Sequence, residues 1–170
     1  MRVTQVKLST TLAMTGVAGA IAVAGLASPA QAATTTAKAP ACSVAKNKLV
    51  LQFAHDYVTG KKVDQPLSIS TKGKKTCLLS GRPVVRLLDK KHKVIGVYKG
   101  AKGQALVGPA DQAVFHLTFT KGGKHPVHPA WVQVTVSPKG AAFKPIRWSS
   151  TYRSISKKSI KVGALKPWLD

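Results

Sequence analysis

Residues 77–89 read Cys-Leu-Leu-Ser-Gly-Arg-Pro-Val-Val-Arg-Leu-Leu-Asp, and the interpretation of the whole chain starts from this stretch. It joins a cysteine, a Gly-x-Pro sequence typical of turns, and a run of β-forming residues. We expect a turn at residues 81–83 and a strand over residues 84–89, with Val85 and Leu87 on its buried face. The second cysteine of the chain is Cys42, so a disulfide would tie the fold together at this stretch.

The N-terminus has the pattern of a secretory signal peptide. Arg2 and Lys7 form a short positive region, residues 8–26 are apolar, and Ala30-Gln31-Ala32 supplies an Ala-x-Ala cleavage site. We therefore expect residues 1–32 to be a signal peptide and the mature protein to be secreted, either extracellular or associated with the cell wall. The alternative is an uncleaved anchor, because the apolar segment approaches the ~20 residues that a membrane span needs. After cleavage, no integral membrane span is expected.

Export changes how the two cysteines are interpreted. In an oxidising compartment, two cysteines most simply form one disulfide, Cys42–Cys77. A catalytic redox pair would need closely spaced cysteines of the Cys-x-x-Cys type, and the sequence has none.

The body of the chain has the periodicity of an all-β protein. Short runs of alternating apolar and polar residues are separated by Gly, Pro and Lys, and no stretch has sustained helical spacing. About seven to nine strands in roughly 130 residues is typical of a β-sandwich, although a small barrel would have similar spacing. We expect a flexible Ala/Thr-rich linker over residues 33–41 and a sandwich domain over residues 42–170, in which segment 149–170 has the weakest pattern. The expected strands cover residues 48–53, 66–70, 84–89, 93–98, 113–119 and 131–136, with weaker candidates at 141–148 and 159–162.

The charge balance is strongly basic. The chain has 27 Lys and Arg residues against 5 acidic ones, all of which are Asp, and loss of Arg2 and Lys7 with the signal peptide leaves a net charge of +20. A net charge of about 2–8 is enough to keep a small domain dispersed. The excess should attract polyanions over about 8–10 Å. Outside a cell, these would be anionic wall polymers of the teichoic type, acidic polysaccharides or acidic lipids, whereas nucleic acid is not expected as a partner.

The basic residues cluster in loops and near the C-terminus, and these clusters are the candidate polyanion-binding residues. The alternative is that they serve solubility alone. The candidates are Lys72, Lys74, Lys75, Lys90, Lys91, Lys93, Arg147, Arg153, Lys157, Lys158 and Lys161.

Other chemistry finds little support in the sequence. His125 and His128 follow a Gly-Gly turn, but metal sites usually take three or four protein ligands, and carboxylates are scarce. The Gly-x-Ser-x-Gly elbow of many hydrolases is absent, and His55-Asp56 is more simply interpreted as part of a turn. We therefore expect no catalytic, cofactor-binding or metal-binding residues, and a monomeric, non-enzymatic protein. The alternatives are an enzyme with an unrecognised site, or a cationic effector acting on membranes, which would normally carry an amphipathic helix.

The order of these motifs resembles a known family. Cys42 is followed by Cys-x-Leu-x-Gly-x-Pro at 77–83, Val-x-Leu-Leu-Asp at 85–89, Leu-x-Gly-Pro at 106–109 and Ala-x-Phe-x-Leu at 113–117. Over about residues 42–138, this pattern resembles the secreted domain of unknown function 4232 of Gram-positive-type envelopes. The resemblance implies an exported, immunoglobulin-like antiparallel β-sandwich with no established catalytic residues. The chain departs from that family at Arg82, where an aromatic residue is usual, at the inverted Gly108-Pro109, and in lacking a second cysteine pair.

Overall fold

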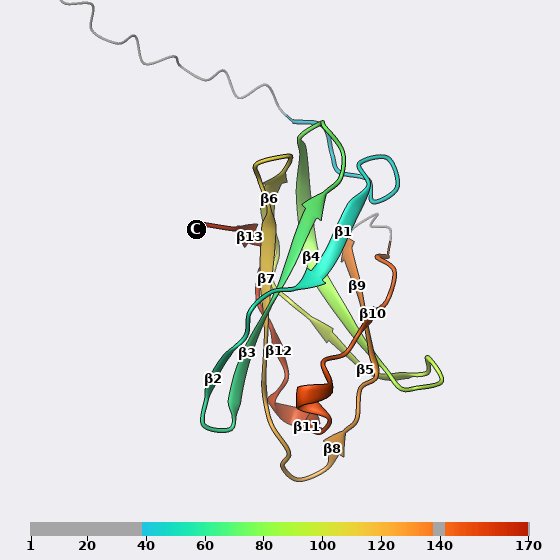
Figure 1. Ribbon diagram of the computed structural model, residues 1–170, viewed down its shortest axis with the longest axis vertical. Coiled ribbons are helices and arrows are strands. Elements are labelled where there is room, and N and C mark those ends of the chain that lie inside the picture. Colours follow the sequence, from blue (N-terminus) through green and yellow to red (C-terminus); the bar gives the residue numbers. More distant parts are fainter. Residues whose placement is uncertain (1–38, 138–141, 170) are drawn as a thin grey trace, which may run out of the picture. The chain divides into compact units, whose positions relative to one another are not determined.

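Two antiparallel sheets packed face to face form the protein (Figure 1). The computed structural model describes residues 39–137 and 142–169, which belong to one compact unit. The expected signal peptide and most of the expected linker lie outside the described residues. No helix in the described ranges is long and apolar enough to cross a membrane.

Sheet 1 has the strand order β1-β3-β7-β12, with β2 added to β3 and β13 added to β7. Its strands are β1 (Leu49–Phe53), β2 (Tyr57–Thr59), β3 (Lys62–Thr71), β7 (Ala113–Thr120), β12 (Lys161–Val162) and β13 (Lys166–Pro167).

Sheet 2 has the order β10-β9-β4-β5, with β6 also paired to β4. Its strands are β4 (Cys77–Leu88), β5 (Val94–Lys99), β6 (Gly103–Val107), β9 (Trp131–Ser137) and β10 (Ile146–Arg147). A separate two-stranded ribbon pairs β8 (Pro126–Val127) with β11 (Ile155–Ser156). The helical content of the described residues is limited to two short 3₁₀ turns, η1 (Ser150–Tyr152) and η2 (Lys157–Ser159).

The predicted all-β, antiparallel architecture is confirmed. The two sheets are not joined into one hydrogen-bonded cylinder, so the barrel alternative is wrong. Thirteen strands occur in the described residues, more than the expected seven to nine, because six of them have only two or three residues. Such short segments carry too few residues to produce a periodic signal.

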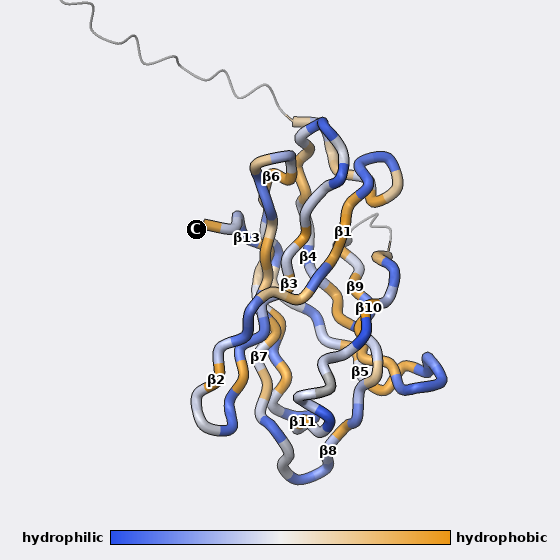
Figure 2. Tube along the Cα trace, viewed as in Figure 1, coloured by the Kyte–Doolittle hydropathy of each residue, from blue (hydrophilic) through white to orange (hydrophobic). Residues whose placement is uncertain are grey.

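One hydrophobic core lies between the sheets. Alternate residues of β4 and β9 point inward, and Val85, Leu87 and Val134 are fully buried. They join Leu67 and Phe115 of sheet 1 in the same cluster. Figure 2 shows that the loops before and after β4 are hydrophilic.

The turn expected at residues 81–83 is wrong, because β4 runs unbroken from Cys77 to Leu88. Its first part pairs with β6, ending at Gly81, and its second part pairs with β9, beginning at Arg82. Gly81 has a φ of 141°, a conformation that favours glycine. The motif therefore marks the point where a single strand changes partners.

The predicted disulfide is confirmed. The sulfurs of Cys42 and Cys77 are 2.02 Å apart, and Cys77 is fully buried. Beside it, the Cys42 amide donates to the Leu78 carbonyl and the Leu78 amide donates to the Pro40 carbonyl. Contacts with sheet 2 thus begin just before Cys42.

The C-terminal segment connects the edges of the two sheets. β12 and β13 pair with β7 of sheet 1, and the same segment lies against β5 and β6 of sheet 2. The approach is close at two glycines. A Cβ atom on Gly100 would lie 2.3 Å from the Gly163 carbonyl oxygen, and one on Gly103 would lie 2.1 Å from the Leu165 carbonyl oxygen.

Candidate functional site

A groove of about 780 Å³ opens at one end of sheet 2. We call it the basic groove, because Lys90, Arg147 and Arg153 line it and none of its lining residues is acidic. Its lining consists of Lys90, His128, Pro129, Ala130, Trp131, Arg147, Trp148, Ser149 and Arg153. Three cations in one concave site without a carboxylate favour an anionic ligand.

The walls come from segments far apart in the sequence. Lys90 lies in the β4–β5 turn, Trp131 begins β9, and Arg147 ends β10. Arg147 and Trp131 are direct cross-strand partners, and the guanidinium carbon of Arg147 lies 5.8 Å from the centre of the Trp131 ring. This cation–π contact holds the guanidinium at the groove, and its N–H groups lie in the guanidinium plane.

The β4–β5 turn is shaped by an acidic side chain. The Asp89 carboxylate accepts hydrogen bonds from the amides of Lys91 and Lys93, at 2.8 and 2.9 Å. His92 adopts a left-handed φ of 60°, and its ring stacks on Trp131 with centroids 4.8 Å apart. The one carboxylate in this turn therefore orders the basic residues around it.

The floor of the groove rests on the core. Trp148 is buried, and its Nε1 donates to the Tyr152 carbonyl at 2.7 Å. Its ring also contacts Phe53 and Phe119, with centroid separations of 5.9 and 5.4 Å. A floor fixed in this way gives the groove a preformed shape.

A hydrogen bond links the β8–β9 connection to the residue that follows η1, and both segments line the groove. Nδ1 of His128 lies 2.9 Å from the Arg153 carbonyl oxygen, so it is the donor in this bond. It holds the backbone that carries the Arg153 side chain.

The structure brings together three of the predicted polyanion-binding residues, Lys90, Arg147 and Arg153. Lys91 and Lys93 are exposed in the same turn as Lys90. The other predicted residues lie elsewhere: Lys72, Lys74 and Lys75 are in the β3–β4 loop, Lys157 and Lys158 are in η2, and Lys161 is on β12.

The β3–β4 loop lies at the start of β4, and Lys90 lies just beyond its end. As a strand of 12 residues, β4 spans roughly 36–40 Å. The lysines of that loop therefore lie far from the basic groove. Lys161 lines a different depression, together with Lys61 and Lys62.

Sequence reasoning did not identify Trp131, His92 or His128 as part of the site. For Trp131 a signal existed, since Val132, Val134 and Val136 mark the buried face of β9, and Trp131 therefore belongs to the opposite face. No local pattern places His92 beside Trp131, because this contact depends on the β4–β5 turn and on the pairing of β9 with β4. Likewise, the bond from His128 to the Arg153 carbonyl joins residues that are 25 positions apart.

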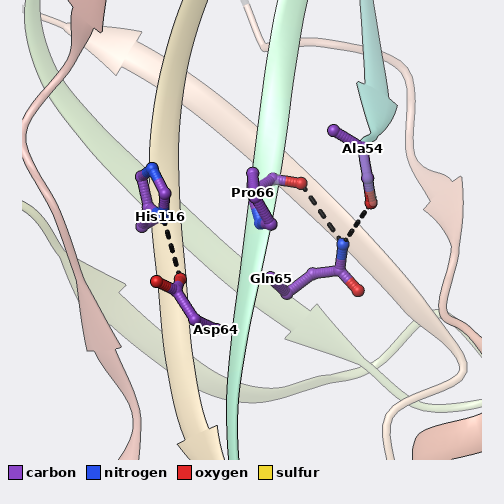
Figure 3. Close-up of polar contacts among 5 residues, drawn as sticks. All are labelled: Ala54, Asp64, Gln65, Pro66 and His116. Carbon is purple, nitrogen blue, oxygen red and sulfur yellow. Dashed lines mark hydrogen bonds and ion pairs between the residues drawn. The ribbon is translucent and has the colours of Figure 1, made fainter. Parts of the chain in front are cut away.

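Other titratable side chains form a smaller cluster on sheet 1 (Figure 3). Nδ1 of His116 lies 2.9 Å from Oδ1 of Asp64, with the two side chains 43% and 36% exposed. Next to them, the buried Gln65 amide donates to the carbonyls of Ala54 and Pro66. His116 and Asp64 are therefore a paired, partly exposed couple on neighbouring strands of sheet 1.

His125 and His128, which were considered as metal ligands in the sequence, have other roles in the structure. Within residues 39–137 and 142–169, no group of three or more His, Cys, Asp or Glu residues could hold a metal ion. His128 instead bonds the Arg153 backbone, and His125 occupies a left-handed turn position with φ 57°.

Tyr98 is a half-buried side chain on β5. It faces the core as the cross-strand partner of Val85, and its hydroxyl donates to the Lys157 carbonyl at 3.5 Å. Burial raises the pKa of the Tyr98 phenol above its usual value of 10.0, because the charged phenolate loses solvation.

The family assignment follows from a match over nearly all of the described domain. Residues 42–166 match the family described as Domain of unknown function (DUF4232). The chain belongs to this family. No curated protein and no solved structure matches the chain. The resemblance inferred from the spacing of Cys77, Gly81 and Pro83 is thereby confirmed at the level of the family.

Proposed function

We propose that this chain is a secreted, non-enzymatic β-sandwich module that associates with anionic polymers of the cell envelope through the basic groove. The observation that carries the proposal is the convergence of Lys90, Arg147 and Arg153 around Trp131. An even scatter of the charge would serve solubility alone, whereas Lys90 and the segment that carries Arg147 and Arg153 are far apart in the sequence and meet in one concave site.

The chemistry of the groove favours recognition of phosphate or carboxylate groups. A guanidinium presents N–H donors in a fork that matches such groups, and lysine adds a mobile point charge. The secretion pattern at residues 1–32 supports an extracellular or wall-associated location, where anionic polymers are the abundant polyanions.

The proposal is tested by retention on purified anionic cell wall over a range of salt concentrations. The test variant is Arg147→Gln with Arg153→Gln, and the matched control is Lys72→Gln with Lys75→Gln, which removes the same charge from the β3–β4 loop. We expect the wild-type protein to be retained at low salt and released as salt rises, because added ions screen charge pairs. The groove variant should elute at clearly lower salt than the control.

Two results would contradict the proposal. Equal losses in the two variants would show that net charge alone drives retention. Retention that is insensitive to salt, or absent at low salt, would exclude electrostatic association with the wall.

A further inference from the structure

The outer face of sheet 2 has a second basic depression, beyond the basic groove. We call it the Arg82 depression. It has a volume of about 590 Å³. Its lining consists of Ser80, Gly81, Arg82, Val84, Lys99, Lys102 and Gly103. It carries three cations and no acidic residue, as the basic groove does.

The register of the strands places Trp131 and Arg147 of the basic groove on the same face as the Arg82 depression. In β4, the odd-numbered residues Pro83, Val85 and Leu87 are buried, so Arg82 and Arg86 point outward. Leu88, at the other end of β4, is the cross-strand partner of Trp131. Six residues of strand separate Leu88 from Arg82, a distance of about 20 Å.

Arg86 lies between the two sites. Its Nη1 donates to Oγ1 of Thr135 at 3.2 Å, which uses one of the five N–H donors of a guanidinium. The outer face therefore presents cations at the basic groove, at Arg86 and at the Arg82 depression, along the line of β4.

Among the described residues, no carboxylate lines either depression, and Asp89 is the carboxylate at the end of β4. Asp56 and Asp111 lie in the β1–β2 and β6–β7 connections, and Asp64 is on β3 of sheet 1. Asp89, at the end of β4, accepts hydrogen bonds from its own turn. We call the line of cations from the basic groove past Arg86 to the Arg82 depression the basic track; the carboxylate beside it, that of Asp89, is bonded to backbone amides of its own turn.

Aliphatic side chains alternate with the cations. Val84 lies between Arg82 and Arg86 on β4, and Val97, which is 50% exposed, is the cross-strand partner of Arg86. A ligand that matches this surface carries anionic groups at intervals, separated by units with exposed C–H surface. An inorganic polyphosphate has the charge without the apolar spacing.

We infer that the outer face of sheet 2 binds one extended segment of a linear polymer of phosphodiester-linked sugar or polyol units. The segment runs from the basic groove past Arg86 to the Arg82 depression. This inference rests on the proposed function for the groove and adds to it a direction, a length of about 20 Å and a second set of contacts.

The test measures the affinity of the intact mature protein for poly(glycerol phosphate) of two lengths by titration calorimetry. One fraction is much shorter than the ~20 Å track and the other is much longer. The test variant is Arg82→Gln with Lys99→Gln, and the matched control is Lys62→Gln with Lys161→Gln, which removes the same charge from exposed positions of sheet 1. Thermal unfolding of each variant establishes that it is folded.

We expect the Arg82/Lys99 variant to bind the long polymer at least about tenfold more weakly, since one Lys or Arg near an anionic surface typically contributes about fivefold. Its affinity for the short fragment should be unchanged, and the control variant should bind both lengths like the wild type. Long inorganic polyphosphate of equal charge should bind the wild type more weakly than the glycerol polymer.

Three outcomes would overturn the inference. An unchanged affinity of the Arg82/Lys99 variant for the long polymer would refute the track while leaving the groove proposal intact. Tighter binding to vesicles of anionic phospholipid than to the polymer would identify a lipid surface as the ligand. Absence of binding of any probe by the wild type at low salt would contradict the groove proposal as well.

Discussion

The disulfide offers the most direct quantitative test of this fold. Replacement of both cysteines, Cys42→Ala with Cys77→Ala, removes the covalent link without leaving a free thiol. The bond joins residues separated by 35 positions. In the chain-entropy treatment, opening a loop of that length destabilises the folded state by about 4 kcal/mol at 25 °C. Typical domains have only about 5–15 kcal/mol of stability in total.

The same free energy gives an expected shift in melting temperature. Unfolding entropy is roughly 2 cal/mol/K per residue, so a domain of this size should lose about 10–15 °C in Tm. Circular dichroism during heating, and guanidinium unfolding at 25 °C, measure both quantities. Wild-type protein unfolded in the presence of reductant should match the double variant, whose own unfolding should be insensitive to reductant.

A loss of less than about 1 kcal/mol would refute this reasoning. It would show that the chain between Cys42 and Cys77 is already restrained when the rest of the protein is unfolded.

Two further predictions concern the edge between the sheets and the alkaline pH range. Gly103→Ala places a Cβ 2.1 Å from the Leu165 carbonyl oxygen. We expect it to cost about 1–3 kcal/mol and to speed hydrogen exchange at the Gly163 amide, which bonds the His116 carbonyl. In Gly60→Ala the Cβ meets nothing within 4 Å, and the left-handed φ of 58° strains only the β2–β3 turn. This variant should leave that exchange unchanged, and equal exchange in both variants would contradict the close contact. Because burial raises the pKa of Tyr98, its neutral form is favoured in the folded state. Its contribution to stability is therefore present below the unfolded value near 10 and is lost as pH rises through the folded pKa. Wild-type protein should lose more stability than Tyr98→Phe above pH ~10, and parallel losses in urea unfolding would argue against this effect.

Much of the fold could be predicted because the alternation of apolar residues along a strand is visible in the local sequence. In β7, Ala113, Phe115, Leu117 and Phe119 share one face in the sequence and are all buried in the structure. Residues of β9 show the same correspondence. A half-buried strand must present one face to the core, so its periodicity is visible without knowledge of its partners.

The error at residues 81–83 has a physical cause. Glycine and proline interrupt most strands, so Gly81-Arg82-Pro83 has the local character of a turn. In the structure, β4 is held on both sides of Gly81 by different partners, β6 before it and β9 after it. Pairing with two neighbours overrides the local preference, and sequence spacing gives no information about that pairing.

For the candidate site as well, some features could be predicted from the sequence and others depended on strand pairing. The sequence by itself determined the all-β class, the family, the cysteine pair, and the excess of positive charge, because each is recorded in residue type or spacing. Only the tertiary structure decided which cations act together. Lys90 and Arg147 are separated by more than fifty residues and meet because β9 pairs with both β4 and β10. The lysines at 72–75 belong to the same charge excess, but the length of β4 keeps them at the other end of the sheet.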